Sequence, residues 1–194
     1  MKEKAARIVR ILTVPPLLTV FMLEILYRRL GFAMGTPPEI MAAIGCLSVL
    51  PACAYPIAQI KTEFRDNRRE GQRKMAFFMN LCGYLAAVIY GTTKNVSDVL
   101  MWIFVSYFIA AVVLTIINRG FKTKASGHAC SCVLPYLMLC YFLGGTVIAV
   151  CLFLYLIEFW ASVYLKCHTV SEFLTGSAVA AVVFGFTGLM FRFC

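Results

Sequence analysis

Charged side chains are scarce in this chain. They make up 14% of its 194 residues, only nine of them are acidic, and histidine occurs twice. Apolar residues account for 61%, and the mean hydropathy is +0.84. Soluble globular domains carry about 25% charged residues. The composition therefore excludes an ordinary soluble domain.

Seven apolar runs approach or reach the ~20 residues that a helix needs to cross a bilayer. We predict an all-α, polytopic transmembrane helix bundle of about six to seven spans. The short fifth run is either a span or a helix partly buried inside the protein. Apart from Glu24 near one end, the predicted spans are nearly free of charge, which disfavours a transporter or channel. The runs are 8–27, 38–60, 75–92, 96–117, 128–142, 146–163 and 172–191.

No internal repeat and no low-complexity linker divides the chain, so we predict one integral-membrane domain over residues 1–194. The basic start, MKEKAARIVR, runs into an apolar segment without a small-residue cleavage site. This pattern predicts no cleavable signal peptide.

No CxxC pair occurs among the nine cysteines, and most of them fall inside predicted spans. Free cysteine is commonly a small buried apolar residue, so reduced structural thiols are the favoured interpretation. A metal site built from Cys130, Cys132, Cys167 and the two histidines is the alternative. We predict no metal and no cofactor.

The cations are unevenly distributed over the two predicted faces. Fourteen of the 18 basic residues fall on the face of the N-terminus and of residues 61–74, 118–127 and 164–171. The positive-inside rule places that face in the cytoplasm. We expect a multi-pass protein of the plasma (inner) membrane. The bilayer is its expected partner, and we expect it to bind no nucleic acid. The opposite face keeps Arg28, Arg29, Lys94 and Arg192.

Three polar segments interrupt the apolar pattern: residues 61–74, residues 118–128 and the stretch YLKCHTVSEFLTG at 164–176. Two predicted spans separate each segment from the next. An even number of crossings returns the chain to the same face. Residues 61, 128 and 168 are therefore expected to be neighbours in space.

The third segment has the spacing of a histidine paired with a carboxylate. Positions i and i+4 share a helix face, so Glu172 can contact His168. A carboxylate that holds one ring nitrogen leaves the other as a directed nucleophile or base. Gly176, four residues further on, permits close helix packing.

The other two segments add the groups that an anion site requires. Ser126 and Gly127 precede His128 at a predicted helix start, where a hydroxyl and backbone N–H groups can bind an anion. His128 could there donate a proton to a leaving oxygen. Lys61 and Arg68 lie seven residues apart, on one face if helical, and suit phosphate oxygens.

Each segment also has a simpler interpretation. Residues 61–74 could be a cytoplasmic loop that meets anionic headgroups. His168 and Glu172 could tie two helices together by a hydrogen bond. Ser126 could be merely the residue that caps a helix.

The first two segments resemble motifs of the superfamily of type 2 phosphatidic acid phosphatases and vanadium haloperoxidases. That superfamily has the motifs K-x6-R-P, P-S-G-H and S-R-x5-H-x3-D. Lys61-x6-Arg68-Arg69 resembles the first, with arginine in place of proline. Ala125-Ser126-Gly127-His128 resembles the second, with alanine in place of proline.

The third segment resembles the third motif. Ala161-Ser162-x5-His168-x3-Glu172 has Ala-Ser where the family has Ser-Arg, and glutamate where it has aspartate. The resemblance spans residues 61–176 and keeps the family order.

The resemblance implies a membrane phosphatase that hydrolyses phosphate or diphosphate esters of lipids. Phosphatidate, phosphatidylglycerophosphate and isoprenyl diphosphates are the implied substrate classes. His168 would form a phosphohistidine, Glu172 would orient it, and His128 would protonate the leaving alcohol and later activate water. No metal is implied. The implied phosphate ligands are Lys61, Arg68, Arg69, Ser126, Gly127 and Lys166.

One departure concerns a phosphate ligand of the family. Ser162 stands at the third-motif arginine, and losing a cation there would slow phosphoryl transfer by orders of magnitude. Lys166 or Arg69, ahead of Lys124, is the expected replacement. The alternative is a catalytically impaired relative that binds lipid phosphates or a partner protein.

Overall fold

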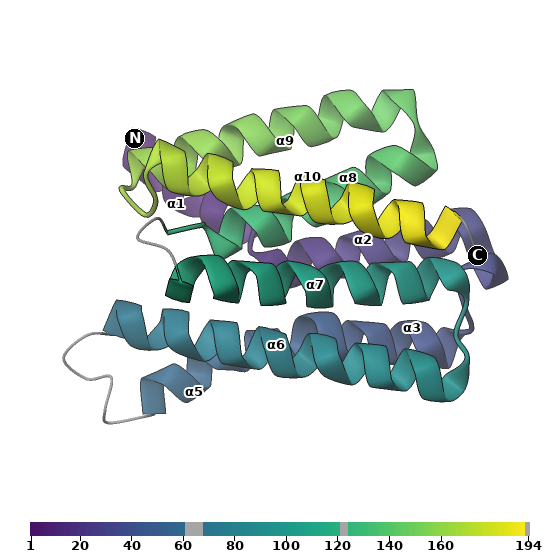
Figure 1. Ribbon diagram of the computed structural model, residues 1–194. Coiled ribbons are helices and arrows are strands. Elements are labelled where there is room, and N and C mark those ends of the chain that lie inside the picture. The colour runs from purple at the N-terminus through teal and green to yellow at the C-terminus, as the bar shows by residue number, and fades with distance from the viewer. Residues whose placement is uncertain (61–67, 121–123, 193–194) are drawn as a thin grey trace.

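The computed structural model describes residues 1–60, 68–120 and 124–192, except for the side chains at 59–60, 68–70, 73, 146 and 192. Every regular element within these ranges is helical. Figure 1 shows the long helices lying side by side in one bundle. The predicted all-α class is therefore confirmed.

The long helices correspond to the predicted apolar runs. One run is divided in two, and another contains a π-helical stretch at Gly45–Val49 and a turn at Cys53. The elements are α1 (Lys2–Leu12), α2 (Pro15–Leu30), η1 (Gly31–Ala33), α3 (Pro37–Ile44), η2 (Gly45–Val49), α4 (Leu50–Ala52), α5 (Ala54–Ile60), α6 (Arg68–Lys94), α7 (Asp98–Gly120), α8 (Gly127–Leu143), α9 (Gly145–Tyr164) and α10 (Val170–Arg192).

Several helices are long and apolar enough to cross a membrane. Within the described residues there are 5 such segments, or 6 if α1 and α2 count as one bent span. These helices are consistent with the predicted multi-pass membrane protein. α8 has 17 residues, about 25 Å at 1.5 Å per residue, and is shorter than the ~30 Å hydrocarbon core. The five are Pro37–Ala58, Lys74–Lys94, Asp98–Gly120, Val147–Tyr164 and Val170–Phe191.

The first predicted run, 8–27, is wrong as one continuous helix. α1 and α2 are bent by 53° relative to each other. Val14 between them has an extended backbone, with φ −62° and ψ 131°. Pro15 causes this because proline lacks an N–H donor and disfavours helical geometry in the residue before it. α1 is thereby a separate amphipathic helix that packs against α9.

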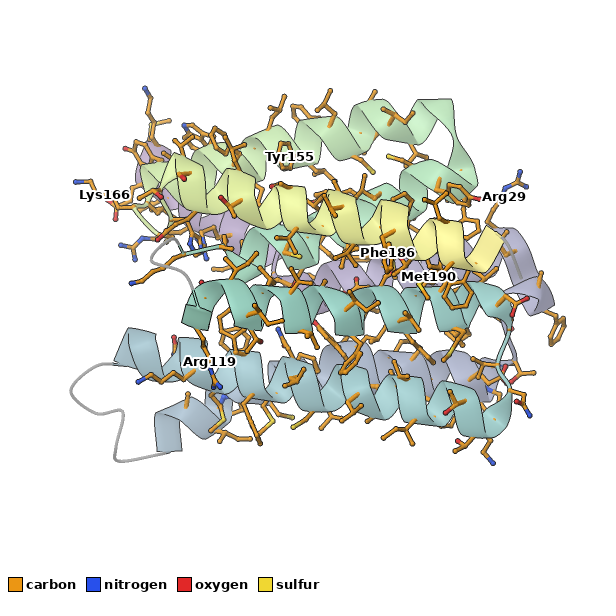
Figure 2. All side chains as sticks on the ribbon, viewed as in Figure 1. Arg29, Arg119, Tyr155, Lys166, Phe186 and Met190 are labelled. Atoms are coloured by element: carbon orange, nitrogen blue, oxygen red, sulfur yellow. The ribbon has the colours of Figure 1, made fainter. Side chains whose placement is uncertain are left out.

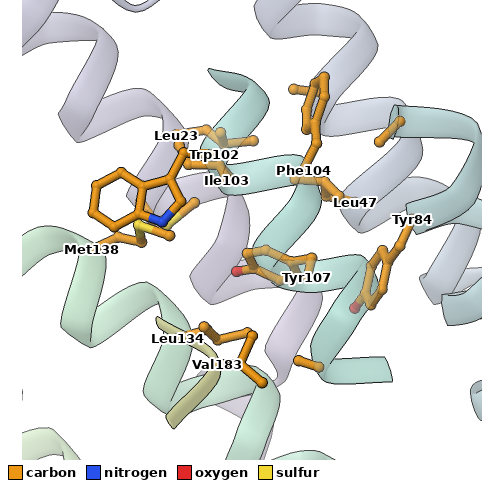
Figure 3. Close-up of a cluster of buried hydrophobic side chains, with 14 of the residues drawn as sticks. Leu23, Leu47, Tyr84, Trp102, Ile103, Phe104, Tyr107, Leu134, Met138 and Val183 are labelled. Atoms are coloured by element: carbon orange, nitrogen blue, oxygen red, sulfur yellow. The ribbon is translucent and has the colours of Figure 1, made fainter. Parts of the chain in front are cut away.

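α8 is the central helix of the bundle. It packs against α10, α2, α9 and α7, and its buried residues lie on several sides of the helix. Figure 3 shows Leu134 and Met138 of α8 within the main core, together with Trp102 and Tyr107 of α7. The short fifth run is therefore the partly buried helix that the sequence left as one of two options.

Hydrogen bonds between helices join the core where it is otherwise apolar. The hydroxyls of Thr19 and Tyr107 lie 3.0 Å apart and connect α2 to α7. Trp102 Nε1 donates to Thr187 Oγ1 at 3.0 Å and connects α7 to α10. Such bonds fix which helix faces meet when apolar packing alone is unselective.

One end of the bundle collects the helix ends that flank the three polar segments. Figure 1 places the N-terminus, the end of α5, the start of α6, the start of α8 and the α9–α10 connection at this end. Figure 2 shows Lys166 and Arg119 there and Arg29 at the opposite end. The predicted crossing parity therefore holds for the described helices.

Candidate active site

His128 lies in the first turn of α8 because Ser126 caps that helix. Ser126 has an extended backbone, and its Oγ accepts a hydrogen bond from the Ala129 N–H at 3.1 Å. A serine at this position satisfies one of the N–H groups that a helix start leaves unpaired. The predicted helix start at Ser126-Gly127 is confirmed.

His168 lies in the tight connection between α9 and α10. The backbone carbonyl of Ser162 accepts hydrogen bonds from the N–H groups of Cys167 at 3.0 Å and His168 at 3.4 Å. Lys166 adopts a left-handed conformation, with φ 51°, which reverses the chain. Thr169 then begins α10: its N–H donates to Glu172 Oε2 at 3.1 Å and its Oγ1 accepts from the Glu172 N–H at 3.2 Å.

The second and third sequence motifs meet directly. The Ser126 N–H donates to the Glu172 carbonyl at 2.9 Å. Gly176, one turn further along α10, lies so close that a Cβ there would overlap the Ser126 carbonyl. Gly176 therefore permits the close approach that brings the two histidine-bearing segments together. The Ser126 N–H is used in this contact and is unavailable to an anion, contrary to the sequence prediction.

The predicted pairing of His168 with Glu172 is present. Nδ1 of His168 lies 3.5 Å from Oε2 of Glu172, and both side chains are largely buried. Burial, followed by the positive charges of His128 and Arg10, lowers the pKa of His168 from 6.5 to about 4, against the opposing effect of Glu172. His168 is therefore neutral near pH 7. Its neighbours His128 and Arg10 lie within electrostatic range.

Glu158 is a site residue that the sequence prediction missed. It lies on α9 and is fully buried, with its Oε1 3.0 Å from His128 Nε2. Neither of these two atoms has a hydrogen bond of acceptable geometry in the described part of the chain. Tyr136 on α8 donates to the other carboxylate oxygen at 3.3 Å. An acid inside an apolar run is costly, and this alone could have marked Glu158 as functional.

Arg10 is the second missed residue. It lies near the end of α1, and its Nη1 is buried without a hydrogen-bond partner among the described residues. The predicted first span contained this arginine, but the charge was treated only as part of the basic N-terminus. Its relevance depends on how α1 folds back against α9, which local sequence patterns do not reveal.

Of the predicted phosphate ligands that are lysine or arginine, some lie outside the described residues and the others are exposed. Lys61 lies outside the described residues, and the side chains of Arg68 and Arg69 at the start of α6 do too. Lys166 is exposed at the α9–α10 connection (Figure 2), and Lys124 is exposed as well. Within the described residues, neither of these two lysines is buried in the site.

The structure groups a possible set of metal ligands that differs from the cysteine and histidine set named in the sequence analysis. His128, Cys132 and Glu158 offer ligand atoms that lie within 4.8 Å of one another. These are common ligands of zinc. All eight cysteines within the described residues, Cys132 among them, are free thiols. The expectation that the protein uses no metal stays a prediction.

Comparison of the chain with family models, curated proteins and solved structures returns no match.

Proposed function

We propose that this chain is an integral-membrane phosphatase that hydrolyses phosphate or diphosphate esters of lipids through a phosphohistidine intermediate. The supporting observation is the convergence of both histidines of the chain at one end of the bundle, each beside a carboxylate. Phosphatidate, phosphatidylglycerophosphate and isoprenyl diphosphates are the substrate classes proposed.

In the first step His168 is the nucleophile. Glu172 holds the Nδ1–H side of the neutral ring, so the lone pair of Nε2 attacks phosphorus. The bond between phosphorus and the alcohol oxygen breaks. Protonated His128, stabilised by the Glu158 carboxylate, gives its proton to that oxygen, and the lipid alcohol leaves.

In the second step water removes the phosphoryl group. Neutral His128 takes a proton from water as its oxygen attacks phosphorus. The P–N bond breaks, its electron pair returns to His168, and inorganic phosphate leaves. Cations and helix-start N–H groups would stabilise the charge that spreads over the equatorial oxygens in both steps. The ligands proposed from the motifs are Lys61, Arg68, Arg69, Gly127 and Lys166.

The substrate would be a lipid because an apolar groove adjoins the cluster. The groove lies between α8, α9 and α10, has a volume of about 430 Å³, and includes Tyr136, Cys151 and Tyr155 in its lining. Tyr136 also donates to Glu158, so one side chain joins the groove to the His128 pair. The phosphate would meet the histidines while an acyl or isoprenoid tail lies along the groove.

Phosphate release by the purified, detergent-solubilised protein tests the proposal. A panel of phosphatidate, phosphatidylglycerophosphate and farnesyl diphosphate should include at least one substrate that is turned over. Orthovanadate, which mimics phosphate in transfer, should inhibit, and a metal chelator should leave the rate unchanged. Absence of turnover on every lipid, without vanadate binding, contradicts the proposal.

A catalytically impaired lipid-phosphate binder is the second candidate, favoured by one observation. Ser162 stands where the resembled family has its arginine, and it is fully buried. This candidate expects lipid phosphates and vanadate to bind without any phosphate release. It also expects His168→Ala to leave the biological role intact.

A further inference from the structure

We propose that Arg10 on α1 is a phosphate ligand of the site and takes the place of the cation that Ser162 does not supply. This inference rests on the proposed function and adds to it, because it assigns a ligand to a helix outside the three motifs. The ligand is the phosphate group of the lipid substrate.

α1 is positioned to deliver a side chain to the site. The break at Val14 bends it by 53° from α2, and it packs along α9, the helix that carries Glu158 and Ser162. Figure 1 shows α1 beside α9 at the end of the bundle where α8 and α10 begin. Thr13, at the C-terminal end of α1, accepts a hydrogen bond from Cys132 Sγ at 3.3 Å, which ties this end of α1 to the His128 helix.

Arg10 carries a buried donor that has no acceptor. Its Nη1 is inaccessible to solvent and unpaired among the described residues. A guanidinium has five N–H donors, is always charged and accepts no hydrogen bond. Burying part of it without an acceptor or counter-charge is unfavourable. Because no described protein group supplies that partner, the missing acceptor is best explained as an anionic ligand.

The electrostatic effect of Arg10 extends to both histidine-bearing segments. The charge of Arg10 contributes to lowering the pKa of His168, and it also acts on Cys132, which belongs to the His128–Glu158 cluster. A cation near both histidines can stabilise the tetrahedral phosphate that they exchange. Its fork of donors also matches phosphate oxygens better than a lysine does.

Ser162 completes the argument. Its hydroxyl is buried and has no hydrogen-bond partner among the described residues, and its carbonyl holds the His168 connection. Because a serine cannot supply a positive charge, the proposed phosphate site requires a cation from elsewhere in the chain, and α1 packs against α9. Lys166 and Lys124, the replacements predicted from the sequence that can be located, are exposed.

Arg7 provides a matched control on the same helix. It is an exposed arginine whose Nη2 lies 2.6 Å from Glu3 Oε1, so it already forms an ion pair within α1. Loss of Arg7 alters the charge of α1 as much as loss of Arg10 does. Any difference between the two variants therefore reports position rather than net charge.

The experiment measures orthovanadate affinity by calorimetry on purified full-length protein in detergent. Arg10→Gln should weaken vanadate binding about tenfold or more, Arg10→Lys should weaken it less, and Arg7→Gln should bind as wild type does. Equal affinities of wild type and Arg10→Gln overturn the proposal, and so does a wild type that binds no vanadate. If Arg10→Gln elutes as an aggregate, Arg10→Lys decides: weaker binding is expected, and unchanged affinity contradicts the assignment.

Phosphate release separates this inference from the proposed function. If vanadate binding depends on Arg10 but no lipid is turned over, the anion site is supported and the proposed phosphatase activity is contradicted. If Arg10→Gln turns over lipid phosphate at the wild-type rate, the phosphatase activity is supported and the role of Arg10 as a phosphate ligand is contradicted.

Discussion

The two glutamates of the site have different environments and are assigned different tasks. Glu158 is fully buried and lies beside three side chains of α8: Tyr136, His128 and Cys132. Glu172 caps the start of α10 through Thr169 and lies beside His168. Under the proposed function, Glu158 stabilises the protonated acid, whereas Glu172 positions the nucleophile.

Substitution of Glu158 tests the first of these tasks. Glu158→Gln removes the charge while keeping a carbonyl oxygen that can accept from Tyr136. We expect the kcat for lipid-phosphate hydrolysis to fall roughly a hundredfold, with little change in KM, because the protonated form of His128 loses its counter-charge. Glu24→Gln is the control, since Glu24 is an acid on α2 that pairs with Arg28 at 2.7 Å. An unchanged kcat in Glu158→Gln would remove this role.

The lowered pKa of His168 predicts a pH dependence with a definite sign. The folded protein binds this proton only near pH 4, whereas an unfolded chain binds it near pH 6.5. Above pH 6.5 His168 is neutral in both states and does not lower the free energy of unfolding. As the pH falls from 6.5 towards 4, the unfolded chain binds a proton that the folded protein does not, so the free energy of unfolding decreases. Well above pH 4 the His168 ring is neutral, as the proposed role of nucleophile requires.

Nuclear magnetic resonance of isotope-labelled histidine measures this titration, since the chain has two histidines. His168→Gln assigns the signals by removing one of them. The His168 signal is expected to titrate near pH 4. A midpoint near 6.5 would mean that the ring is solvated and is not held between His128, Arg10 and Glu172.

At this scale the sequence predicted local geometry well and tertiary partners poorly. The His168–Glu172 contact was predicted from i, i+4 spacing and is present, although His168 lies just before α10 rather than on it. The Ser126 cap follows from its residue type. Glu158 was missed because a single acid hardly alters the mean hydropathy of a long apolar run. Arg10 was missed because the groups on which its charge acts, His168 and Cys132, lie more than a hundred residues away in sequence.

Among the elements, the crossing of α8 and α10 decides whether the two histidines can cooperate. These helices have one of the most extensive contacts in the bundle, and Gly176 forms the closest approach to the Ser126 backbone. A side chain at position 176 must therefore push the start of α8 away from α10. Such a shift would separate His128 from His168.

Gly176→Ala is expected to destabilise the fold by about 1–3 kcal/mol, since a rigid backbone carbonyl opposes the added methyl group. Gly185→Ala on the same helix is the control, because no atom of a neighbouring residue lies within 4 Å of the position that its new Cβ would occupy. This control should leave stability unchanged or raise it by up to about 1 kcal/mol, because alanine favours the helix more than glycine does. Unfolding in mixed micelles with increasing denaturing detergent gives both values. Equal stabilities of the two variants would show that the close contact is not required.

Helix positions were predicted within several residues wherever an apolar run is bounded by polar residues, as for α7, α9 and α10. The break between α1 and α2 was not, although Pro15 and Pro16 are visible in the sequence. Hydropathy stays high across that point, so the apolar signal masked the backbone constraint that proline imposes. The consequence is functional, since the break is what turns α1 towards α9.

At the scale of the whole molecule, the account depends on crossing parity and on orientation. The described helices bring the flanks of all three polar segments to one end of the bundle (Figure 1). Parity could be predicted from the number of spans alone. Which side of the membrane this end faces follows only from the distribution of cations, and the cytoplasmic assignment remains our proposal.

Cysteine labelling tests both points. In a background without native cysteines, Lys124→Cys and Lys166→Cys should resist a membrane-impermeant reagent in intact cells, whereas Lys94→Cys at the opposite end should react. All three sites should react after the cells are opened. Reaction of the first two variants in intact cells would place the site on the outer face, and a difference between those two would contradict the parity itself.

The central claim is that His168 receives the phosphoryl group of a lipid. Its most direct test is phosphate release by wild type and His168→Ala, side by side, from the lipid of the panel that wild type turns over fastest. We expect His168→Ala to lose at least about a thousandfold in rate, as loss of a covalent nucleophile does. A His168→Ala protein that folds normally and releases phosphate at the wild-type rate would contradict the account.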